Sequence, residues 1–156
     1  MAFPLSVTQT VSTSASPAAV WRAFERVDLW PTAIPALAAA KLKPRGALAA
    51  GSRILTRATP SSGSADIEYK VVAAEPPRRL VLTIDDPDYR SRFEYRIAAE
   101  AGATDVVVTA TLEAVGLMQT VRFLLWQTRL MPILGTTARE RTQALVHLAE
   151  RLGGGA

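Results

Sequence analysis

The last quarter of the sequence carries an apolar pattern with helical spacing that runs from about residue 117 to residue 152. Pro132 interrupts it, and because proline cannot donate to the carbonyl of Thr128, we expect a kink or a short break there. Glycines at 153–155 end the pattern and predict a flexible tail over 153–156. The recurring positions form one continuous face: Leu117, Val121, Leu124, Leu125, Thr128, Met131, Gly135, Ala138, Thr142, Leu145, Ala149 and Leu152.

The chain before this helix reads as a series of strands. Between residues 3 and 13 the odd positions are mostly apolar and the even positions are small and polar, which is typical of a half-buried strand. Short connections rich in Gly, Pro, Ser and Asp separate the later strands and favour an antiparallel meander over crossover units. Six further strands are predicted, at residues 40–44, 52–58, 67–74, 80–84, 92–98 and 105–113.

A short helix is predicted over residues 17–26, between the first two strands. Ser16 is a good N-cap residue, and Pro17 suits the first helical position because its missing N–H needs no partner there. Val20, Phe24 and Val27 give this helix one apolar stripe. The residue before Pro31 is disfavoured in a helix, so we expect a break there and a second short helical turn over 32–37.

Composition restricts the function. The 156 residues fit a single domain over 1–152, and the absence of cysteine excludes disulfides and thiolate metal sites. With one histidine, His147, a multi-histidine metal cluster is also excluded, and we expect no metal and no cofactor. The net charge of +4 comes from scattered arginines without a basic patch, which argues against nucleic-acid binding. No secretion signal is present, so we expect a cytoplasmic protein.

Several motifs carry a family resemblance. Ser-Pro-Ala-Ala-Val-Trp at 16–21, Leu-Trp-Pro at 29–31, the hairpin at Gly51 and Glu-Pro-Pro-Arg-Arg-Leu at 75–80 resemble the START-like superfamily of polyketide cyclases/dehydrases and lipid-transport proteins (SRPBCC). The resemblance implies the α+β helix-grip fold, in which a curved antiparallel sheet of about seven strands wraps around the long C-terminal helix, with two short helices after the first strand. It also implies a cavity for an apolar or aromatic ligand. One departure is Ala33-Ile34-Pro35, where the family usually has a second aromatic residue.

The strand faces give candidate ligand-binding residues. Tyr69, Phe93 and Tyr95 lie at positions of apolar parity and are expected either to line the cavity with Leu82 or to form plain core. Arg92, Glu94 and Arg96 have the opposite parity, which predicts charge pairs on the outer face. If Thr128 faces the cavity, its hydroxyl is one of few polar groups there. The full candidate set is Trp30, Tyr69, Leu82, Phe93, Tyr95, Val121, Leu125, Thr128 and Met131.

No catalytic residue is identified. His147 falls on the polar side of the last helix and reads as a solvated surface histidine, and no nucleophilic triad is supported. The acidic turn at 85–88 lacks the glutamate and glycine positions of a calcium loop, which favours a solvated turn.

Three functions remain open. The first is binding or transport of a hydrophobic small molecule, lipid-like or aromatic, in an internal cavity. The second is an aromatase/cyclase-type enzyme acting on a polyketide-like substrate, with Tyr69, Tyr95 and Arg129 as weak candidates for proton transfer. The third is an interaction module, a homodimer or a membrane-surface contact through a second apolar stripe of Phe123, Trp126, Leu130 and Ile133. Arg122, Gln127 and Arg129 argue against stable membrane insertion.

Overall fold

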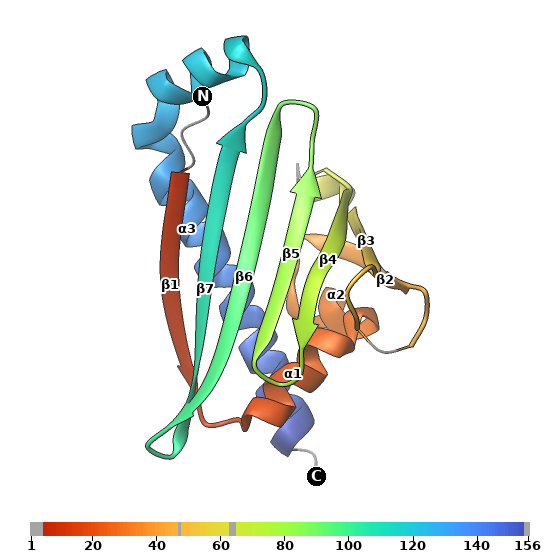
Figure 1. The fold of residues 1–156 in the computed structure, drawn as a ribbon. Helices are drawn as coiled ribbons and strands as arrows, with labels where there is room; N and C mark the ends of the chain where they lie inside the picture. Colours follow the sequence, from red (N-terminus) through yellow and green to blue (C-terminus); the bar gives the residue numbers. More distant parts are fainter. Residues whose placement is uncertain (1–4, 47, 63–64, 155–156) are drawn as a thin grey trace.

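The computed structural model describes residues 5–46, 48–62 and 65–154, without the side chains of 117, 119–120, 123–130 and 154. Within these residues a seven-stranded antiparallel sheet covers a long C-terminal helix (Figure 1), which confirms the predicted α+β helix-grip fold. The strands are β1 Leu5–Thr13, β2 Leu37–Lys43, β3 Arg53–Ala58, β4 Ile67–Glu75, β5 Arg79–Asp85, β6 Tyr89–Glu100 and β7 Ala103–Ala114. The helices are α1 Pro17–Glu25, α2 Trp30–Ala33 and α3 Leu117–Gly154, with short 3-10 turns at Val27–Leu29 and Pro60–Ser62.

The order of strands in the sheet is β1-β7-β6-β5-β4-β3-β2. The chain leaves β1 at one edge, passes through α1 and α2, and enters β2 at the other edge. It then returns strand by strand until β7 pairs with β1. This route places α1 and α2 beside the C-terminal part of α3, where they contact it and help to cover the inner face of the sheet (Figure 1).

The first two helices form largely for the predicted local reasons. The Ser16 hydroxyl accepts a hydrogen bond from the Ala19 amide at 3.1 Å, and Pro17 opens α1. Phe24 is fully buried against the core. The second helix begins at Trp30 rather than at residue 32, because Pro31 fits its first turn instead of ending a helix.

The long helix has two unlike parts. It bends in its first half, which extends past the ends of β1 and β7, whereas the remainder runs behind the sheet (Figure 1). Pro132 lies inside the helix without breaking it, and the helix reaches Gly154, two residues beyond the predicted end. The buried positions that the structure describes lie in the second half: Gly135, Ala138, Thr142, Leu145, Val146, Leu148 and Ala149.

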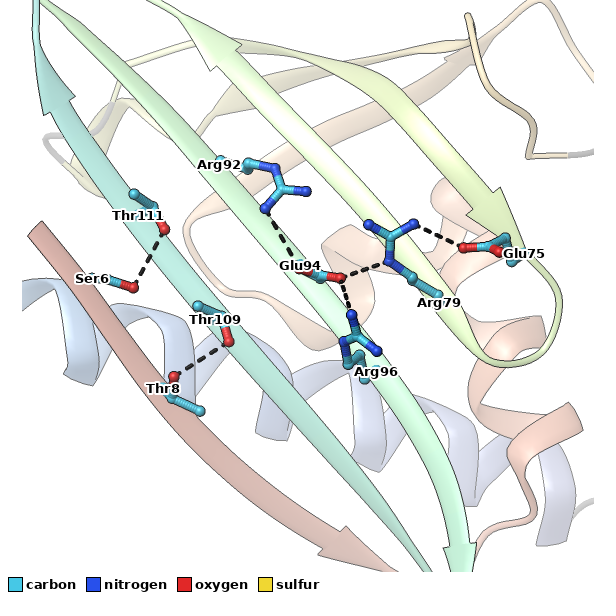
Figure 2. Close-up of polar contacts among 9 residues, drawn as sticks. All are labelled: Ser6, Thr8, Glu75, Arg79, Arg92, Glu94, Arg96, Thr109 and Thr111. Atoms are coloured by element: carbon cyan, nitrogen blue, oxygen red, sulfur yellow. Dashed lines mark hydrogen bonds and ion pairs between the residues drawn. The ribbon is translucent and has the colours of Figure 1, made fainter. Parts of the chain in front are cut away.

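Polar side chains cover the outer face of the sheet (Figure 2). The carboxylate of Glu94 on β6 forms ion pairs with three guanidinium groups, at N–O distances of 2.6 Å to Arg79, 3.1 Å to Arg96 and 3.5 Å to Arg92. Hydroxyl pairs join β1 to β7, for example Thr8 to Thr109 at 3.3 Å. The predicted cross-strand charge pairing is therefore present between Glu94 and Arg79, whereas the contacts of Glu94 with Arg92 and Arg96 lie within β6. Among the described residues, no helix has both the length and the apolar content that a membrane crossing needs.

Candidate functional site

An apolar cavity lies between the inner face of the sheet, the two short helices and the second half of α3. Strand alternation builds one wall, because Phe93 and Tyr95 are two residues apart on β6 and therefore point the same way. In the register of the sheet, Leu82 and Leu80 on β5 lie opposite these two residues. The cavity is lined by Phe24, Trp30, Ile34, Leu37, Thr56, Tyr69, Leu80, Leu82, Phe93, Tyr95, Ala138, Arg141 and Leu145.

The cavity is closed in this structure. Its volume is about 20 Å³, which holds about one water molecule and is too small for an aromatic ring. Close packing of aromatic side chains accounts for this, since the rings of Phe24 and Tyr95 lie 5.1 Å apart at an angle of 58°. The open, hollow space implied by the family resemblance is therefore not present, and a ligand enters only if part of the lining moves.

Some of the polar side chains around the cavity already form hydrogen bonds within the protein. The Trp30 indole donates to the Ala23 carbonyl at 3.0 Å, and the Thr56 hydroxyl donates to the Ile67 carbonyl at 3.0 Å. These contacts fix the two side chains and remove their donors from ligand recognition.

Tyr69, Tyr95 and Arg141 form a polar cluster within this lining. Arg141 Nη1 donates to Tyr69 Oη, which links α3 to β4 across the gap between helix and sheet. Both tyrosines are 5% exposed. Burial raises the pKa of the Tyr95 hydroxyl well above its usual range, and the nearby Tyr69 adds to this, while Arg141 opposes it. Tyr95 therefore keeps its proton at neutral pH, and its hydroxyl is able to donate a hydrogen bond.

The structure brings five of the nine predicted site residues together around this cavity: Trp30, Tyr69, Leu82, Phe93 and Tyr95. Val121 and Met131 are not part of the described lining, since their side chains are 50% and 45% exposed. Both residues belong to the first half of α3, which extends past the sheet (Figure 1). The side chains of Leu125 and Thr128 lie outside the described residues. Whether any of these residues binds a ligand stays a prediction.

Sequence reasoning missed the helical wall of the cavity. Ala138, Arg141 and Leu145 form it, and their spacing of three and four residues places them on one face of α3. The helical pattern of the sequence places Ala138 and Leu145 on the buried face, and their spacing is compatible with Arg141 on the same face. Arg141 is not predicted from the sequence, because a cation in an amphipathic helix usually lies in solvent.

The other residues considered for catalysis, metal binding or dimerisation either lie away from the cavity or have side chains that the structure does not describe. His147 is exposed, with Nδ1 3.6 Å from Glu150 Oε2, as its place on the polar side of the helix predicted. In the part of the chain that the structure covers, no three His, Asp or Glu side chains are grouped to hold a metal ion. Of the stripe proposed for dimerisation, Phe123, Trp126 and Leu130 have side chains outside the described residues, as does Arg129.

Comparison with known proteins agrees with this architecture. The chain resembles the di-domain ARO/CYC StfQ from the steffimycin biosynthetic pathway, with a TM-score of 0.75 and 14% identity over 97% of this chain and 52% of that one. It also resembles norcoclaurine synthase from Thalictrum flavum, with a TM-score of 0.72 and 9% identity over 94% and 87% of the two chains. A START superfamily protein from Mycobacterium smegmatis is also similar, with a TM-score of 0.71 and 14% identity over 94% of this chain and 98% of that one.

These likenesses establish the fold. No curated protein sequence matches the chain. A family model, by contrast, matches residues 4–153 and so spans the sheet, the short helices and nearly all of α3. The chain therefore belongs to the family described as polyketide cyclase/dehydrase and lipid transport.

Proposed function

We propose that this protein binds an apolar small molecule, aromatic or lipid-like, between the inner face of the sheet and the second half of α3. The observation that carries the proposal is the lining itself, in which aromatic and aliphatic side chains surround a few convergent polar groups. Membership of a family that includes lipid transport supports it.

Binding requires the closed cavity to open, and one wall is suited to move. Ile34 and Leu37 line the cavity from the segment that runs from the end of α2 into the first residue of β2. This segment follows a helix of four residues and begins an edge strand whose register shifts between Leu37 and Ala39. Short helices and irregular edge strands open at lower free-energy cost than central strands do. A ligand enters by displacing this wall while the central strands stay in place.

The proposal is tested by titrating the protein with fatty acids and aromatic polyketides. Trp30 lines the cavity, so its fluorescence reports occupancy, and native mass spectrometry gives the stoichiometry. We expect saturable binding of one molecule per chain and an increase in thermal stability. If no member of the panel binds or shifts the melting temperature, the proposal is wrong.

A matched pair of variants locates the binding. Ala138 is buried and lines the cavity, so Ala138→Phe places a ring in the space that the ligand needs. Thr136→Phe adds a ring to an exposed position of the same helix. We expect the first variant to lose binding at least about 10-fold while remaining folded by circular dichroism, and the second to bind as wild type does. Equal binding by both variants contradicts a site in this cavity.

The polar cluster supports a second candidate, an aromatase/cyclase-type enzyme. Tyr69 and Tyr95 line the cavity together with Arg141, where a protonated phenol is able to donate to a carbonyl oxygen as negative charge develops on it. The test is cyclisation of a poly-β-ketone thioester, compared with the same reaction without protein. In this case Tyr95→Phe lowers the rate and leaves the dissociation constant unchanged. A wild-type rate equal to the reaction without protein excludes the enzyme.

A further inference from the structure

The charge of Arg141 is balanced differently from that of the outer-face arginines. A guanidinium stays protonated at any pH that a protein meets, so its burial is costly unless an anion accompanies it. Arg141 and Arg79 are both half-buried. Arg79 contacts the carboxylates of Glu75 and Glu94 at 2.9 Å and 2.6 Å. The contact that the structure gives Arg141 is with the neutral phenol of Tyr69.

Every Asp and Glu of the chain lies within the described residues. Among those residues, none has a carboxylate oxygen within 4.0 Å of the Arg141 guanidinium. Within the part of the chain that the structure describes, the cavity lining therefore contains a cation without a carboxylate counter-ion.

The neighbouring hydroxyl groups are also donors toward the cavity. Because Tyr69 Oη accepts from Arg141, the Tyr69 O–H remains a donor toward another group. The Tyr95 hydroxyl stays protonated, because burial raises its pKa. Three donor groups from β4, β6 and α3 thus belong to one lining whose other members are mostly apolar. Such a set is suited to a carboxylate, whose two oxygens accept several hydrogen bonds.

We propose that Arg141, Tyr69 and Tyr95 form an acid-recognition point, and that the ligand is an amphipathic carboxylic acid whose carboxylate contacts Arg141 while its apolar body occupies the cavity. This inference rests on the proposed function, because it names the chemical class of the molecule that binds there. The ligand carboxylate takes the place of the contact between Arg141 and Tyr69 that holds helix and sheet together in the closed structure. Entry of the ligand then also neutralises this half-buried cation.

The test compares probes that differ in the head group alone. Dodecanoate is titrated against 1-dodecanol, and 2-naphthoate against 2-naphthalenemethanol, with tryptophan fluorescence and calorimetry as readouts. We expect wild-type protein to bind each acid about 10- to 100-fold more tightly than its alcohol, since hydrogen bonds to a charged group are the strong ones. The aliphatic and aromatic pairs also show which kind of apolar body fits.

Variants then assign the difference to one side chain. Arg141→Met is expected to weaken acid binding about 10- to 100-fold and to leave alcohol binding within about 3-fold. Arg141→Lys keeps the charge without the planar fork and is expected to retain part of the preference for the acid. Arg139→Met removes the same charge from an exposed position two residues away and is expected to bind both probes as wild type does. Circular dichroism shows that each variant is folded.

The outcomes separate the two proposals. If wild-type protein binds acid and alcohol equally, or if Arg141→Met weakens both to the same extent, the acid-recognition point is wrong and cavity binding stands. The same holds if Arg139→Met lowers acid affinity as much as Arg141→Met does, because the effect is then one of overall charge. If no probe binds to wild-type protein, both proposals fail.

Discussion

The two faces of the sheet carry opposite chemistry on the same strands. On β6, Phe93 and Tyr95 point inward to the cavity, while Arg92, Glu94 and Arg96 point outward into a network of ion pairs (Figure 2). The inner face is buried and carries aromatic rings, whereas the outer face is polar and partly exposed. Both faces use the backbone alternation of a strand, so neighbouring residues have unlike roles.

The two faces are therefore expected to contribute differently to the stability of the fold and to the register of its strands. Burial of a large apolar side chain contributes about 1.5–3 kcal/mol, whereas an exposed ion pair contributes about 0–1 kcal/mol. The inner face is therefore expected to provide most of the free energy of folding. The outer pairs, which join β4 to β5 and β5 to β6, favour one register of the strands.

The largest effect is expected on the inner face. Leu80 on β5 is buried and lines the cavity, so Leu80→Ala should lower the free energy of unfolding by about 2–5 kcal/mol. The matched control is Val72→Ala on β4, where the side chain is 52% exposed, with an expected change within about 0.5 kcal/mol. Urea denaturation followed by circular dichroism measures both. Similar losses for the two variants would remove the distinction between the faces.

An intermediate, pH-dependent effect is expected at Glu94. Hydrogen bonding and charge from Arg79, with smaller contributions from Arg96 and Arg92, lower the pKa of its carboxyl below the ordinary value. The stabilisation is therefore present above the pKa of the unfolded chain and is lost as pH falls through the lower pKa of the folded protein. We expect Glu94→Gln to be less stable than wild type by about 1 kcal/mol at pH 7. The difference should shrink as the pH approaches 3.

The control for this pH effect is Glu113→Gln on β7, where the structure shows no ion pair with a described residue. Its stability relative to wild type should change little between the same two pH values. A Glu94→Gln difference that is constant with pH would contradict the role given to the network.

The smallest effect is expected among the outer hydroxyl pairs. Thr8 and Thr109 face each other at 3.3 Å on exposed parts of β1 and β7. Replacing both by valine exchanges a weak, solvent-accessible hydrogen bond for a β-branched apolar pair. The free energy of unfolding should stay within about 0.5 kcal/mol of wild type in thermal or urea melts. A loss above about 2 kcal/mol would show that the outer face contributes more to stability than we assign to it.

The same comparison shows what the sequence predicts well. A period of two is unambiguous in strands, so the parity of Tyr69, Phe93 and Tyr95 placed them on the cavity side, and the parity of Arg92 and Glu94 placed them outside. Capping chemistry at Ser16 likewise located the start of α1 at Pro17, where the helix begins. Both signals are local, and the sequence contains all of their information.

The helical wall of the cavity was less predictable. The first half of α3 is rich in apolar residues, which favours Val121 and Met131 as lining residues, yet both side chains are exposed. This half of the helix extends past the end of the sheet (Figure 1). Which turns of a helix lie against a sheet depends on the length of the last strand and on its connection to the helix, and helical periodicity does not record either one. Arg141 was missed because the cavity becomes visible only after β4, β6 and α3 are assembled.

The strand order has a consequence for how the protein is made. Leu5 pairs with Leu112 and Thr13 with Thr104, so the first strand of this sheet to be synthesised receives its partner from the last strand of the same sheet. Contacts between such distant parts of a chain form slowly, and an unpaired edge is exposed in the meantime. Since α3 follows β7 in the chain, the cavity acquires its helical wall only after the strands of this sheet have been synthesised, and a ligand has a complete site to enter only once α3 has packed against the sheet.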